Sequence, residues 1–210
     1  MNFKNADWLF SLLYPSLCWK VNTSGKKLFL TFDDGPVPGI TEYVLAELQK
    51  YQVKATFFCV GDNILKYPDI FCNIIEQGHR VGNHTFNHLN GWRTLNSVYL
   101  DNVLRCQQEI DKYSTSSSGK DLFRPPYGKI KYSQISKLQE SFDIIMWNVL
   151  TGDYDPELPW EKCLHHSIAK TVPGSIIIFH DNIKAAQNIK SVLPRYIEHF
   201  LKKGYSFHSL

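Results

Sequence analysis

The sequence predicts an α/β domain built on a parallel sheet that is either open or closed into a barrel. Short β-rich runs alternate with amphipathic helical patterns along most of the chain, which is typical of this class. Polar, titratable residues come directly after several of the predicted strands, where parallel α/β folds build their sites. The length of 210 residues, with 43% hydrophobic side chains, suits one domain with a substantial core.

The predicted strands are short apolar runs rich in β-branched and aromatic residues. In chain order they are Lys27–Phe32, Ala55–Val60, Arg80–Val81, Leu122–Phe123, Ile144–Val149, Ser175–Phe179 and a terminal candidate at Tyr205–His208.

The predicted helices lie between these runs and carry apolar residues at helical spacing. They are expected at Thr41–Tyr51, Asn63–Gln77, Asn96–Tyr113, Ser133–Glu140, Trp160–Lys170 and Ala185–Lys203. Gly78 stands where a helix C-cap would close the second of them.

Residues 1–26 are predicted to form an amphipathic segment packed on a single domain of residues 27–210. The apolar stretch Trp8–Trp19 is preceded by Asp7 and interrupted by Pro15, so it is a poor signal peptide. It is also far too short to span a bilayer, and no transmembrane segment is predicted.

Charge and cysteine content narrow the possible partners. A net charge of +3 without a Lys/Arg-rich run argues against nucleic acid binding. The five cysteines are widely spaced and form no CxxC pair, so buried free thiols are expected rather than a disulfide framework. This pattern favours a cytoplasmic location, with peripheral association with the envelope as the alternative. The oligomeric state is not predicted.

The pair Asp33-Asp34 ends the first predicted strand and is followed by a Gly-Pro turn. Adjacent strand residues point to opposite sides, so the two carboxylates are expected to have different tasks, such as metal binding and proton transfer. The alternative is ordinary turn chemistry.

Two imidazoles, His84 and His88, stand four residues apart after the third predicted strand. On a helical turn this spacing places both rings on one face, so both can reach one ion. Together with a carboxylate from another strand they predict an open His₂Asp metal site of the kind that catalytic zinc uses.

Two further strand ends carry candidate residues. The prolines of Arg124-Pro-Pro-Tyr127 stiffen a loop, which fixes the direction of the Tyr127 N–H as a donor to an oxyanion, while Arg124 suits a bidentate contact with a carboxylate. His180 ends a wholly apolar strand, where it can serve as a general acid or as a further metal ligand.

In this order the motifs resemble those of the polysaccharide deacetylase family, which is carbohydrate esterase family 4 with its NodB-homology domain. The resemblance extends from about Lys27 to the C-terminus through Thr31-Phe-Asp-Asp-Gly35, His84-Thr-x-x-His88, Arg124-Pro-Pro-Tyr127 and Ile178-Phe-His180. It implies a distorted (β/α)₇ barrel, in agreement with the strand-end argument.

The resemblance also implies a role for each matched residue. Asp33 matches the catalytic base and His180 the catalytic acid. Arg124 matches the arginine that holds the base, and the backbone N–H of Tyr127 matches the oxyanion donor.

The metal ligands that the resemblance implies are Asp34, His84 and His88, with Thr85 bracing the loop of the histidines. The expected ion is divalent zinc, with cobalt, nickel and manganese as alternatives. It would serve as a Lewis acid and activate a water molecule.

The fourth family motif departs from the usual Asp-Thr-x-Asp-Trp pattern. Leu150 stands in the place of its first Asp and Tyr154 in the place of its Trp, while Asp153 is retained and is expected to support His180 or Arg124. Trp147 and Tyr154, together with Tyr127, are expected to line an acetyl pocket or stack on sugar rings, although each is also an ordinary core residue type.

The implied reaction is removal of acetyl groups from N-acetylglucosamine units of chitin-like or peptidoglycan-like chains, so the expected partner is an acetylated carbohydrate. One alternative keeps the site but hydrolyses O-acetyl esters, as xylan-active relatives do, or small amides. Another is a carbohydrate-binding domain without activity.

Overall fold

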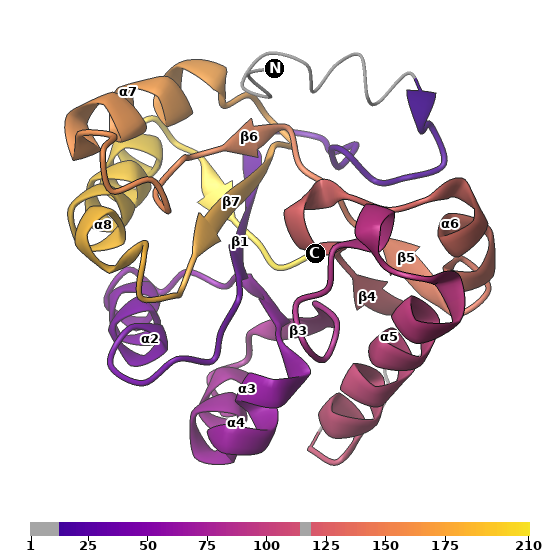
Figure 1. Ribbon diagram of the computed structural model, residues 1–210. Coiled ribbons are helices and arrows are strands. Elements are labelled where there is room, and N and C mark those ends of the chain that lie inside the picture. Colours follow the sequence, from indigo (N-terminus) through magenta and orange to yellow (C-terminus); the bar gives the residue numbers. More distant parts are fainter. Residues whose placement is uncertain (1–12, 114–118) are drawn as a thin grey trace.

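The parallel sheet curls around a central axis with helices outside it (Figure 1). The structure is a computed structural model and describes residues 13–113 and 119–210. Its strands are β1 (Lys27–Asp33), β2 (Thr56–Cys59), β3 (Arg80–Asn83), β4 (Asp121–Phe123), β5 (Phe142–Ile144), β6 (Val149–Leu150), β7 (Ile176–His180) and β8 (Ser206–Phe207). Their order is β5-β4-β3-β2-β1-β7-β6, all pairs are parallel, and β8 adds to β1.

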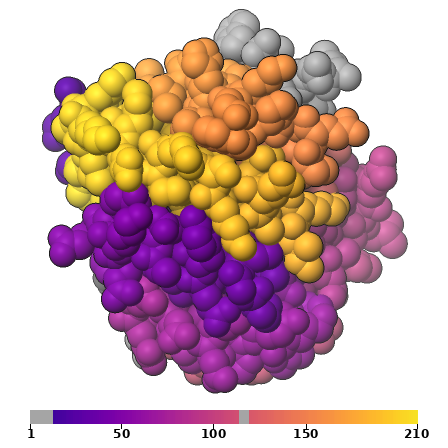
Figure 2. Space-filling model, turned by 90° about the vertical axis from the view of Figure 1, so that its left-hand side faces the viewer, coloured from indigo at the N-terminus to yellow at the C-terminus, as the bar shows by residue number. Residues whose placement is uncertain are grey.

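The α-helices cover the outer face of this sheet. They are α2 (Thr41–Lys50), α3 (Gly61–Lys66), α4 (Pro68–Glu76), α5 (Asn96–Asp111), α6 (Tyr132–Leu138), α7 (Trp160–Lys170) and α8 (Ala186–Lys202). In the space-filling view the yellow C-terminal residues lie directly beside the violet residues of α2, where Tyr51 donates a hydrogen bond to Glu198 on α8 (Figure 2).

Two predicted elements are wrong in their extent. The helix predicted over Asn63–Gln77 is two helices. Pro68 has no backbone N–H to donate to α3, so that helix ends before it and α4 begins at Pro68. The strand predicted at Ile144–Val149 is also divided: β5 and β6 lie at opposite edges of the sheet, and residues 145–148 pass between them.

This crossing segment helps to close the sheet into the distorted (β/α)₇ barrel that the resemblance implies. The N–H of Ile145 donates to Phe123, and the N–H of Asn148 donates to Ile176 near the other edge. Residues 13–26 add to the closure, since Cys18 bridges to Ile145 and Lys20 to Ser175. The predicted boundary at residue 26 stays a prediction, because residues 1–12 lie outside the described part of the chain.

Alternation along the strands separates an outer core from the barrel interior. Leu28, Leu30 and Phe32 of β1 pack in the cluster beneath the helices. The intervening Phe29 belongs to a second cluster with Phe58 of β2, Leu122 of β4, Ile176 of β7 and Ile145 of the crossing segment. Because side chains repeat every two residues, Thr31 and Asp33 follow Phe29 on the inner face.

The cysteines agree in part with the sequence expectation. None of the five is disulfide-bonded; Cys59, Cys106 and Cys163 are buried, whereas Cys18 and Cys72 are half-buried. Among the described residues, no helix combines the length and apolar character that crossing a bilayer requires.

Candidate active site

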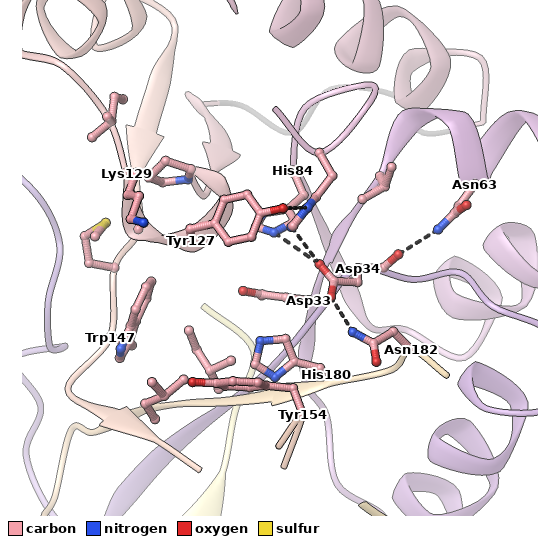
Figure 3. Close-up of a pocket in the computed structure, with 18 of the residues that line it drawn as sticks. Asp33, Asp34, Asn63, His84, Tyr127, Lys129, Trp147, Tyr154, His180 and Asn182 are labelled. Carbon is pink, nitrogen blue, oxygen red and sulfur yellow. Dashed lines mark hydrogen bonds and ion pairs between the residues drawn. The ribbon is translucent and has the colours of Figure 1, made fainter. Parts of the chain in front are cut away.

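A cavity of about 860 Å³ opens at the carboxyl ends of the strands and gathers the predicted site residues. Asp33, Asp34, His84, Tyr127 and His180 point toward its centre from four different strand ends (Figure 3). Residues that are far apart in the sequence therefore lie together at the strand ends, as predicted.

Asp33 and Arg124 form a buried ion pair at the floor of this cavity. The guanidinium donates a 2.7 Å hydrogen bond to Asp33 Oδ1, and the two side chains are 5% and 0% exposed. Arg124 also donates to the Thr31 hydroxyl at 2.7 Å and to the carbonyls of Ile145 and Met146 at 3.2 and 3.0 Å. These bonds fix the orientation of the Asp33 carboxylate.

Asp34 contacts different partners, but it lies just beyond the end of β1 with a φ of 86°, so the bend after the strand, and not strand alternation, sets its direction. Its Oδ1 lies 3.5 Å from His84 Nε2 and 3.1 Å from His88 Nε2. Burial alone would raise the pKa of Asp34, but the two imidazoles and the charge of His180 hold that pKa well below its ordinary value.

These three residues fit a divalent metal ion. Their potential ligand atoms lie within 4.8 Å of one another. Asp34 Oδ1 is buried without a hydrogen-bond partner in the described structure, which is the position a cation would complete. His84 Nδ1 lies 2.8 Å from the Arg124 carbonyl, so Nδ1 carries the proton and Nε2 keeps its lone pair for a metal.

The two histidines lie in a loop, so their prediction on a helical turn was wrong. Thr85 and His88 have φ values of 64° and 54°, in the left-handed region that an α-helix excludes. The Thr85 hydroxyl accepts a 3.0 Å hydrogen bond from the Leu89 N–H, and Asn102 Oδ1 accepts from Phe86 and Asn87. Side-chain hydrogen bonds thus stabilise a loop that still directs both rings to Asp34.

Tyr127 lines the cavity, and its backbone has a strained conformation with a φ of 61°. The N–H groups of Gly128 and Lys129 bond back to Pro125 and Pro126, whereas no hydrogen bond from the Tyr127 N–H occurs within residues 13–113 and 119–210. The Tyr127 hydroxyl lies 3.1 Å from His88 Nδ1, which sequence reasoning did not predict.

His180 is held by Asp153, which resolves the choice between His180 and Arg124 as its partner. Asp153 accepts from the His180 N–H at 2.7 Å and lies 2.8 Å from Nδ1. Burial would lower the pKa of His180, but the charge and hydrogen bond of Asp153, helped by Asp34 and Asp33, raise it to about 9. This shift favours the protonated imidazole at neutral pH.

The divergent fourth motif contributes to the wall of the cavity. Leu150 and Tyr154 both line it, and the Tyr154 ring packs edge-on against His180 with centroids 5.0 Å apart. Trp147 also lines the cavity from the segment between β5 and β6, and it is half-buried.

Asn182 and Asp181 were missed by the sequence analysis. Asn182 Nδ2 donates a 2.5 Å hydrogen bond to Asp34 Oδ2, and its Oδ1 accepts from the Ala185 N–H at 3.0 Å (Figure 3). Asp181 accepts from the Gly35 N–H at 3.0 Å and from the Thr41 hydroxyl at 2.6 Å. Both follow His180 directly, so the rule that polar residues gather at strand ends could have found them.

Known proteins resemble this chain over most of its length. The family described as "Polysaccharide deacetylase" matches residues 20–143. Two peptidoglycan-N-acetylglucosamine deacetylases of Bacillus cereus are 31% and 28% identical; the matches cover 86% and 90% of this chain and 66% and 88% of those proteins. Chitin deacetylase 1 of Saccharomyces cerevisiae is 36% identical over 63% of this chain and 42% of its own length.

A solved structure has the same fold over nearly the whole chain. The Bc1960 peptidoglycan N-acetylglucosamine deacetylase, crystallised with 4-naphthalen-1-yl-N-oxidanyl-benzamide, superposes with a TM-score of 0.88 at 28% identity. The match covers 96% of this chain and 94% of that one.

Proposed function

The chain belongs to the polysaccharide deacetylase family, and from this premise we propose that it hydrolyses the acetamide of N-acetylglucosamine units in a carbohydrate chain, using the residues around the cavity. The observation that carries the proposal is the convergence of three units on one cavity: the Asp33–Arg124 pair, the Asp34, His84 and His88 cluster, and the His180–Asp153 pair.

Asp33 is proposed as the general base. Arg124 holds one of its oxygens, which leaves the other to take a proton from the attacking water. The water oxygen then bonds to the acetyl carbon, and the carbonyl oxygen becomes an oxyanion that the Tyr127 N–H stabilises.

His180 is proposed as the general acid. An amide does not release its amine unless the nitrogen is protonated, so the proton on His180 is required when the C–N bond breaks. The raised pKa of His180, at about 9, keeps that proton available at neutral pH, and Asp153 fixes the ring. The products are acetate and the free amino sugar.

Asp34, His84 and His88 are proposed to hold a divalent ion, with zinc expected. When bound, such an ion polarises the acetyl carbonyl and lowers the pKa of water. The Tyr127 hydroxyl near His88 and the Arg124 carbonyl near His84 orient the two rings toward it.

The test is acetate release measured after reconstitution with zinc, cobalt, nickel or manganese, with the bound metal quantified by elemental analysis. The substrates are N-acetylglucosamine oligomers, acetylated xylan and small acetamides. The proposal expects activity on the N-acetylglucosamine oligomers that is lost on chelation and restored by metal. Activity on xylan esters alone would overturn the assignment of the acetamide as substrate.

Two variants separate the base from the metal ligands. Asp33→Asn is expected to abolish turnover while it keeps the metal, and His84→Ala is expected to lose both. Near-normal activity of Asp33→Asn would show that the proposed base is wrong.

A further inference from the structure

The cavity continues past Tyr127 to the ammonium group of Lys129 (Figure 3). Lys129 is half-buried, and its Nζ lies 5.7 Å from the centre of the Trp92 ring and 5.9 Å from that of Tyr127. Both distances are close to the limit for a cation–π contact, so the rings stabilise the charge only weakly. Within residues 13–113 and 119–210 the ammonium contacts only these two rings and makes no hydrogen bond or ion pair.

The carboxylates that line the cavity already have other partners, so none of them neutralises Lys129. Their contacts are Asp33 with Arg124, Asp34 with His84 and His88, and Asp62 with Lys66. A half-buried cation beside a cavity and without a counter-ion favours an anion from the ligand.

The backbone that carries Lys129 is rigid. Its N–H donates to Pro126 at 3.1 Å, and its carbonyl accepts from Gly91 at 3.1 Å. Lys129 is two residues from Tyr127, so their Cα atoms are at most about 7 Å apart. An anion at Lys129 would therefore lie on the sugar being deacetylated or on its neighbour.

Two exposed aromatic rings flank the ammonium. Trp92 is 46% exposed and Tyr127 is 59% exposed. The Trp92 indole N–H donates a 3.0 Å hydrogen bond to the Ile130 carbonyl, which fixes the ring beside Lys129. A rigid exposed indole next to a cation suits a sugar ring that carries an acidic substituent.

We propose that Lys129 binds a carboxylate substituent of the glycan next to the reacting acetamide, so the site prefers acidic amino-sugar chains, such as those with lactyl ethers, over neutral chitin-like chains. This inference rests on the proposed deacetylase function. It adds Lys129 as a specificity-determining residue that takes no part in the proton transfers.

The experiment compares three tetrasaccharides: chitotetraose, the alternating N-acetylglucosamine–N-acetylmuramic acid chain, and the same chain with its carboxylates converted to methylamides. For the metal-loaded enzyme we expect kcat/KM to be highest on the acidic chain. Lys129→Gln should lower that value about 10-fold, the scale of a hydrogen bond to a charged group, and change chitotetraose turnover less than about 2-fold. Lys129→Arg should retain the preference.

Two matched variants remove the same charge elsewhere. Lys162 is exposed on α7 and is not part of the cavity wall, so Lys162→Gln should leave the preference unchanged. Lys184 lines the cavity from the segment after β7. If Lys184→Gln rather than Lys129→Gln removes the preference, the proposal is wrong.

Binding measured by calorimetry separates this proposal from the proposed function. If no substrate releases acetate, the deacetylase assignment fails. The role of Lys129 would still be supported if the acidic chain binds more tightly than the others and Lys129→Gln abolishes this difference in affinity. Equal affinity for the acidic and methylamide chains, or no binding of any chain, would overturn it.

Discussion

Replacing Arg124 with glutamine tests whether the Asp33–Arg124 pair stabilises the barrel as well as the site. Arg124 is 0% exposed, and its guanidinium bonds to Asp33, to the Thr31 hydroxyl and to two main-chain carbonyls. The Arg124→Gln variant would leave the Asp33 carboxylate, which is 5% exposed, without its cation. Removing one partner of a buried ion pair costs about 3–5 kcal/mol in the free energy of unfolding. In a domain of this size that lowers the Tm by roughly 6–20 °C.

The assay is urea unfolding followed by circular dichroism, with Arg93→Gln as the control. Arg93 is exposed and makes no side-chain hydrogen bond in the described structure, so its replacement should change the unfolding free energy by less than about 0.5 kcal/mol. The double variant Asp33→Asn/Arg124→Gln should lower the unfolding free energy by less than the sum of the two single changes. Each single change leaves the other charge buried without a partner, whereas the double variant removes both charges. A loss below about 1 kcal/mol for Arg124→Gln, or strict additivity, would refute the reasoning.

Three further predictions concern the residues around this pair, and a fourth concerns the turn after β1. Asp153→Asn removes the main group that raises the pKa of His180 to about 9, so kcat should begin to decline at a lower alkaline pH than in the wild type. An unchanged pH profile would exclude His180 as the acid. Because of the same pKa, protonated His180 should contribute its full share to the free energy of unfolding below about pH 6.5, and this contribution should disappear as the pH rises through about 9. Urea unfolding at several pH values across that range measures the change. A Cβ on Gly35 would lie 2.0 Å from Asp181 Oδ2, so Gly35→Ala should lower the unfolding free energy by about 1–3 kcal/mol in the same assay. Asn182→Ala should weaken metal binding about 10-fold or more in a chelator competition, and unchanged metal affinity would show that its bond to the neighbouring carboxylate does not position that ligand.

The placement of the site followed from the sequence because strand ends are a local signal. Asp33, His84, Arg124 and His180 each follow an apolar run, and parallel topology brings such ends to one face. The conformation of the histidine loop could not be predicted in this way. It depends on Asn102, which lies on α5 and holds the loop through hydrogen bonds 15 and 16 residues away in sequence.

The sequence offered no comparable signal for the division of Ile144–Val149. Its apolar composition is typical of one buried strand. In the barrel the same residues must pass between the two sheet edges, and the N-terminal segment pairs with them there. This path follows from the closure of the sheet and not from the local sequence, whose β-propensity favours one uninterrupted strand. Asn182 was missed for a similar reason, since its partner Asp34 lies 148 residues earlier in the chain.

The alternation along β1 couples stability to the proposed chemistry. Phe29, Thr31 and Asp33 share the inner face, so the row that begins as hydrophobic core ends as the candidate base. Arg124 packs over the Phe58 ring at 4.0 Å while it bonds to Asp33, so it belongs to the interior packing and to the site at once. A truncation at this position would lower both stability and activity and could not tell the two roles apart. The Asp33→Asn variant can, because it keeps the volume of the side chain and removes only its charge: a folded, metal-binding protein without turnover would assign the carboxylate to the reaction.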